Sequence, residues 1–177
     1  MEFRINTGSF RKAILSVWTQ ELFIRAIIQM RQERMRSVKS VRKQKNLIQV
    51  TKESFFEGIK FAKAGNHLFD ISGAIGRYAE ERGYGVVRDL CGHGIGTALH
   101  EAPEIPNYEV GRKGVRLRPG MTLAIEPMIN IGTPEVDWLD DDWTVVTRDG
   151  SLSAHYENTI LITEGEPRIL SLTCENE

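Results

Sequence analysis

The chain is organised around residues 91–101, which read Cys91-Gly92-His93-Gly94-Ile95-Gly96-Thr97-Ala98-Leu99-His100-Glu101. Three glycines flank one histidine, and a second histidine follows seven positions later. Glycine lets a backbone approach a ligand closely or adopt positive φ angles, and imidazole is the commonest metal ligand of proteins. We therefore expect a functional loop here, between a strand at 85–88 and a proline-broken loop at 102–106.

Two glutamates downstream complete this candidate site. They lie in Leu123-Ala124-Ile125-Glu126-Pro127-Met128 and in Ala154-His155-Tyr156-Glu157-Asn158-Thr159. A carboxylate among apolar neighbours needs a cation or hydrogen-bond donors to stay charged. Imidazoles and carboxylates in this order predict a metal site with an acid–base partner, and the donor set suits Mn, Fe(II), Co or Zn. The alternatives are a structural histidine and glutamates on strand edges that face water.

Four motifs together resemble the C-terminal half of a bacterial type I methionine aminopeptidase, over residues 47–172. They are Gly92-His93-Gly94-Ile95-Gly96 with Leu99-His100-Glu101, Pro119-Gly120-Met121 with Glu126-Pro127-Met128, Trp143-Thr144-Val145-Val146-Thr147, and Tyr156-Glu157-Asn158-Thr159. Prolidase and creatinase relatives share the architecture but fit these motifs less well. The resemblance implies an α+β protein, the C-terminal half of a pita-bread (creatinase/aminopeptidase) fold with two helices and a mostly antiparallel sheet.

The resemblance also implies a metal-assisted hydrolysis that removes N-terminal methionine from nascent polypeptides. His93, Glu126 and Glu157 would be the metal ligands, and Glu126 would also handle protons of the attacking water. His100 would act as a catalytic and substrate-binding residue that steadies the scissile carbonyl.

Leu99 and Trp143 match positions that line the pocket for the methionine side chain, where a thioether fits against an aromatic face. Ordinary core packing is the alternative for both. His155 falls near the site in sequence, but it could simply be a cross-strand partner.

The chain departs from the family in its acidic residues. The family uses two cations and five protein ligands, two of which are aspartates upstream of the glycine–histidine stretch. The first aspartate here is Asp70, which already falls inside a predicted helix. We therefore expect at most one divalent cation (Co, Mn, Fe or Zn). The alternative to an active enzyme is a truncated, catalytically impaired pseudoenzyme, and a partner chain could cover the exposed half-fold.

The first 46 residues do not resemble the family. Residues 1–45 hold 11 Lys/Arg against 3 Asp/Glu, whereas the remaining 132 residues hold 12 against 21. This asymmetry predicts a basic leader at 1–46, helical over 12–35 or disordered, followed by a partial catalytic domain at 47–177. The alternatives for the leader are a membrane-surface or nucleic-acid-binding arm and a displaced start of the coding frame. Of these we do not favour the binding arm, so no nucleic-acid partner is expected.

Composition indicates a soluble globular protein of 177 residues, with 41% hydrophobic residues and a mean hydropathy of -0.29. No apolar run is long enough to span a bilayer. The two cysteines, Cys91 and Cys174, do not form a disulfide framework, so we expect a reducing cytoplasmic location.

Apolar periodicity predicts two helices after the leader. Thr51 would cap the first, which would bury Phe55, Ile59 and Ala62 on one face and end at Gly65. Asp70 would cap the second, which carries Ile71, Ala74, Ile75 and Tyr78 on one face and has Gly83 past its end. His67 would be an exposed residue of the intervening turn.

The remaining chain predicts strands at 85–88, 121–125, 143–147 and 153–163. Asp149-Gly150 between the last two is a dipeptide typical of hairpin turns.

Overall fold

The computed structural model of the protein describes residues 14–15 and 38–171. The predicted leader helix at 12–35 therefore lies outside the described residues, except at Ile14–Leu15. These two form the short strand β1, which pairs antiparallel with Val145 and Val146 of another strand. The helix prediction is wrong at this point, because backbone pairing with a sheet edge overrides local helix propensity.

The first helix, α2, spans Val38–Ile59 and begins well before the predicted cap. Thr51 lies inside it, where the buried hydroxyl donates to the Leu47 carbonyl at 2.8 Å. The cap prediction is wrong because no glycine or proline interrupts residues 38–57, so nothing stops the helix from extending toward the N-terminus. Because α2 crosses residues 46 and 47, it does not break at the proposed domain boundary; the division into 1–46 and 47–177 stays a prediction.

The second helix, α3, spans Leu68–Glu80 and begins one turn before the predicted cap. His67 is its N-cap residue, and Asp70 lies in the first turn, where Oδ2 accepts the His67 backbone N–H at 2.8 Å. Asp70 thus satisfies an end N–H from inside the helix. His67 is half-buried rather than exposed. Gly83 follows the helix with a φ of 78°, as its predicted closing role requires.

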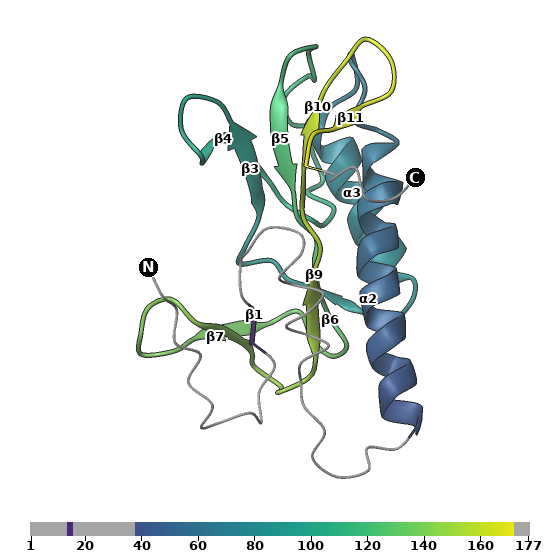
Figure 1. Cartoon of the computed structure of the whole chain (residues 1–177), viewed down its shortest axis with the longest axis vertical. Helices are drawn as coiled ribbons and strands as arrows, with labels where there is room; N and C mark the ends of the chain where they lie inside the picture. Colours follow the sequence, from purple (N-terminus) through teal and green to yellow (C-terminus); the bar gives the residue numbers. More distant parts are fainter. Residues whose placement is uncertain (1–13, 16–37, 172–177) are drawn as a thin grey trace.

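Eleven short strands form three sheets within the described residues, and every strand pair is antiparallel (Figure 1). The central sheet has the order β11–β10–β5–β3–β4, with β3 at Gly92–Ile95, β4 at Glu101–Ile105, β5 at Thr122–Ile125, β10 at Asn158–Leu161 and β11 at Arg168–Ile169. A second has the order β2–β6–β9, with β2 at Gly85–Val86, β6 at Met128–Asn130 and β9 at Ser153–His155. The third, β1–β8–β7, contains β7 at Val136–Trp138 and β8 at Val145–Thr147.

Two predictions about this region are wrong. The expected loops at 91–101 and 102–106 contain β3 and β4, which pair with each other in the central sheet. The Asp149-Gly150 turn does form, with a φ of 70° at Gly150, but it does not close a hairpin. Its flanking strands, β8 and β9, belong to different sheets, because each finds a longer-range partner.

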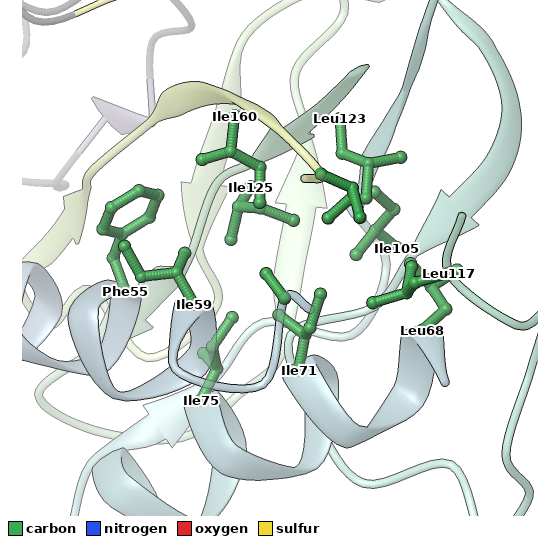
Figure 2. Packing of buried hydrophobic residues seen from close by; sticks show 12 residues of the cluster. Phe55, Ile59, Leu68, Ile71, Ile75, Ile105, Leu117, Leu123, Ile125 and Ile160 are labelled. Atoms are coloured by element: carbon green, nitrogen blue, oxygen red, sulfur yellow. The ribbon is translucent and has the colours of Figure 1, made fainter. Parts of the chain in front are cut away.

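The main core lies between the two helices and the central sheet (Figure 2). Phe55 and Ile59 of α2 and Ile71 and Ile75 of α3 pack against side chains of the sheet, which are Leu123, Ile125 and Ile160. The predicted buried positions on the two helices are thereby confirmed, except that α2 ends at Ile59, before the predicted closing Gly65, so the buried Ala62 lies beyond the helix. Because Leu123 and Ile125 face the helices, Ala124 between them faces the opposite side of the sheet, where the candidate site lies.

None of the helices in the described part of the chain combines the length and the apolar character that a membrane crossing needs.

We expect Tyr78→Phe to lower the free energy of unfolding by about 1 kcal/mol. The Tyr78 hydroxyl donates to Glu53 Oε2 at 2.6 Å and links α3 to α2 near the surface. This hydrogen bond lowers the pKa of Glu53, so its contribution is present at neutral pH and is lost as the pH falls through the folded-state pKa. Urea unfolding at about pH 7 and about pH 3 measures the effect; a difference between the two proteins that does not shrink at the lower pH would contradict it.

Candidate metal centre

Strand register brings the two glutamates face to face. β5 pairs with β10 through Ile125 and Asn158, and β6 pairs with β9 through Met128 and His155. Between these two ladders the chain passes through residues 126–127 on one side and 156–157 on the other. The register before and after these residues is the same, so Glu126 lies opposite Glu157. Residues directly opposite each other on antiparallel strands point to the same side, so the two carboxylates share one side of the sheet.

His93 reaches the same side from the neighbouring strand. It pairs with Ala124 on β5, two residues before Glu126. One ligand atom from each of His93, Glu126 and Glu157 can be chosen so that all lie within 4.8 Å of one another. Three of the predicted site residues therefore converge, from segments that are far apart in the sequence.

The donor set fits a divalent cation. Glu126 is only 5% exposed, and its Oε1 lies 3.7 Å from His93 Nε2. Burial raises the pKa of Glu157, and the neighbouring Glu126 carboxylate raises it further. Two carboxylates so close and so poorly solvated repel each other. A cation between them would remove that repulsion, and one imidazole with two carboxylates suits Mn, Fe(II), Co or Zn.

The ring of His93 is oriented for such a role. Its Nδ1 lies 2.9 Å from the Gly94 carbonyl oxygen, so the tautomer with the proton on Nδ1 donates to that carbonyl. Nε2, the nitrogen that faces Glu126, then carries a free lone pair. Metal-binding histidines are commonly fixed by a hydrogen bond of the other ring nitrogen in this way.

The glycines around His93 are explained by close strand packing. A Cβ on Gly92 would meet the Ala124 carbonyl oxygen of β5, and one on Gly94 would meet the Ala102 carbonyl oxygen of β4. Neither glycine has a positive φ. These glycines are therefore needed for the close approach of neighbouring strands and not for positive φ angles.

His100 lies beside the cluster, at the end of a fixed turn. Its ring centroid is 4.1 Å from that of His93. The Glu101 carboxylate accepts the Ala98 backbone N–H at 2.6 Å and the Thr97 hydroxyl at 2.8 Å. These two hydrogen bonds hold the segment that presents His100 to His93.

The two apolar side chains predicted to contact substrate lie at the surface. Leu99 and Trp143 are each 70% exposed, and neither belongs to the ligand cluster. The Trp143 loop is held by Asp141, whose carboxylate accepts backbone N–H groups of Trp143 and Thr144. Their part in substrate binding stays a prediction.

Two buried side chains that the sequence did not assign to the site contact Glu126. His155 is 7% exposed, and its Nε2 lies 3.3 Å from Glu126 Oε2. The fully buried Asn107 donates from Nδ2 to the Glu126 carbonyl at 3.1 Å. The position of His155 two residues before Glu157 was a usable signal, whereas nothing local marks Asn107.

The chain is similar in sequence to known metallopeptidases. Residues 31–164 match metallopeptidase family M24. A methionine aminopeptidase of Clostridium acetobutylicum is 58% identical over 129 residues, which are 73% of this chain and 51% of that relative. The chain thus spans about half the length of the curated relative.

Solved structures of aminopeptidases and prolidases are also similar to this chain. A methionine aminopeptidase from Thermotoga maritima superposes with a TM-score of 0.72 at 49% identity, covering 74% of this chain and 53% of that one. A prolidase from Pyrococcus horikoshii gives a TM-score of 0.57 at 25% identity, covering 76% and 33%. These likenesses confirm the predicted fold class, and the aminopeptidase is the more similar of the two.

Proposed function

The chain belongs to metallopeptidase family M24, and from this we propose that it is a metal-dependent aminopeptidase that removes N-terminal methionine from polypeptides. The observation that carries the proposal is the convergence of His93, Glu126 and Glu157 on one side of the central sheet. The identity to methionine aminopeptidases supports the choice of substrate. We place the activity in the cytoplasm, where nascent chains are available.

His93, Glu126 and Glu157 would hold the cation through Nε2 and one oxygen of each carboxylate. A divalent cation, when bound, lowers the pKa of a water and polarises a carbonyl group. We favour Mn(II), Fe(II), Co(II) or Zn(II), because the ligand set mixes imidazole with carboxylate. These three residues would supply three ligand atoms to one cation.

The protein residues would divide the remaining work. Glu126 would accept a proton from the attacking water and deliver it to the leaving amine as the peptide C–N bond breaks. His100 would donate an N–H to the carbonyl oxygen as negative charge develops there. Leu99 and Trp143 would supply apolar surface for the methionine thioether.

A second candidate is a metal-binding protein without turnover. It is favoured by the ligand count, because His93, Glu126 and Glu157 are the one group of three or more candidate ligands within residues 14–15 and 38–171. A single weakly held cation would then bind without the second cation that the resemblance implies.

Metal removal and replacement separate the two candidates. The full chain is stripped with a chelator, titrated with Mn(II) or Co(II), and assayed for release of methionine from Met-Ala-Ser. The aminopeptidase requires release that disappears with chelator and returns with metal, and N-acetyl-Met-Ala-Ser as the control peptide must not be cleaved. Metal binding without release would favour the second candidate, and absence of binding would contradict both.

A further inference from the structure

We infer that His155 is a positioning residue that fixes the orientation of the Glu126 carboxylate within the metal centre. The inference deepens the proposed function and rests on it, because it takes Glu126 as a ligand. The sequence places His155 near the site but assigns it no role there.

The carboxylate of Glu126 lies between two imidazoles, each near a different oxygen. Oε1 is 3.7 Å from His93 Nε2, and Oε2 is 3.3 Å from His155 Nε2. Oε1 thus lies nearer to His93, and Oε2 lies nearer to His155 on β9. We infer that the His155 contact holds Oε2 and so leaves Oε1, beside the ligand His93, for a cation.

Both partners of the second contact are withdrawn from water, since His155 and Glu126 are both buried residues. Electrostatic contacts are stronger in such surroundings than at the surface, since water neither screens them nor competes for the oxygen. An apolar residue could fill the same space at position 155, but it would leave Oε2 buried without this contact, which is costly for a carboxylate.

The fold determines where the imidazole lies. His155 pairs with Met128 across the β6–β9 ladder, and the next residue, Tyr156, donates its N–H to the Pro127 carbonyl at 3.1 Å. The Glu126 backbone is itself held by Asn107. Glu126 is therefore fixed at its carbonyl by Asn107, from the segment after β4, and at one carboxylate oxygen by His155 of β9.

Loss of His155 should therefore free the carboxylate to rotate about its terminal torsion, which has a broad preference. Residues that orient a metal ligand typically contribute 10–100-fold to metal affinity. We expect His155→Leu to weaken Mn(II) binding by about 10–100-fold. His155→Gln keeps a side-chain N–H donor at a similar reach and should restore the affinity to within about threefold of the unsubstituted chain.

Calorimetric titration of the full chain with Mn(II) tests this, with Asn130→Ala as the matched control. Asn130 is a fully buried polar residue of the same sheet, on β6, and its Nδ2 donates to the Thr133 carbonyl rather than to the cluster. Its replacement should leave Mn(II) affinity unchanged. Equal losses in His155→Leu and His155→Gln, or an equal loss in Asn130→Ala, would overturn the inference.

A second measurement needs no metal and separates this inference from the proposed function. Urea unfolding of the metal-free chain is compared for Glu126→Gln, His155→Leu and the double variant. If the two groups act on each other, the combined effect on the unfolding equilibrium constant should differ from the product of the single effects by about tenfold. Multiplicative effects would overturn the role of His155, and a chain that binds no Mn(II) yet shows this coupling would contradict the proposed function alone.

Discussion

His93→Ala is expected to abolish Mn(II) binding, with an affinity loss of at least about 100-fold. The imidazole is one of three donors in the cluster, and its removal leaves only two carboxylate donors for the cation. Substitution of groups that merely orient a ligand already costs 10–100-fold, so loss of the ligand itself should cost more. Glu157→Ala should have the same effect, because it removes the carboxylate opposite Glu126.

The matched control for this prediction is His67→Ala. His67 is also a half-buried histidine, but it lies at the start of α3 and outside the cluster. Its capping hydrogen bond runs from its backbone N–H, so the alanine variant keeps it. Calorimetric titration should give unchanged Mn(II) affinity for His67→Ala. Retained stoichiometry in both His93→Ala and Glu157→Ala would mean that the cation site lies elsewhere.

The parts of the fold that local periodicity predicts are the helices and their buried faces. Ile71 and Ile75 recur at the spacing of one helical face, and both are fully buried against the sheet. The predicted helix starts at Thr51 and Asp70 were wrong, because the position where a helix begins depends on which residues upstream prevent it from extending. Thr51 and Asp70 both have the chemistry of a cap, but only the fold decides whether a helix begins there.

Strands were predicted at 121–125 and 153–163, where β5, β9 and β10 lie, whereas β3 and β4 were not predicted, because their stability is not local. Gly92 and Gly94 lack the side chains that favour strands, yet they form β3 because β4 and β5 pair with it on both sides. Such pairing depends on partners outside the strand itself, such as Ala124 for His93, and the local sequence pattern does not show them. The resemblance predicted His93, Glu126 and Glu157 as site residues, while the contacts of His155 and Asn107 with Glu126 follow only from register and packing.

Gly92→Ala tests whether close strand packing is what the glycines supply. A Cβ at this position would meet the Ala124 carbonyl oxygen and would lie 3.4 Å from Glu126 Cγ. The carbonyl belongs to a central strand and cannot move aside without shifting β3 away from β5. We expect a loss of about 3 kcal/mol in the free energy of unfolding, the upper end for an overpacked site. The shift should also weaken Mn(II) binding, since it displaces Glu126 relative to His93.

Gly165→Ala is the matched control, because the same methyl group meets nothing within 4 Å there and the backbone does not need glycine. Its effect on urea unfolding should stay within about 0.5 kcal/mol. If Gly92→Ala were as stable as Gly165→Ala, the strands must separate at little cost, and the histidine would not be held by them. If stability fell while Mn(II) affinity stayed unchanged, the position of Glu126 would be independent of the β3–β5 spacing. The expected joint loss ties the metal centre to the same backbone contacts that build the central sheet.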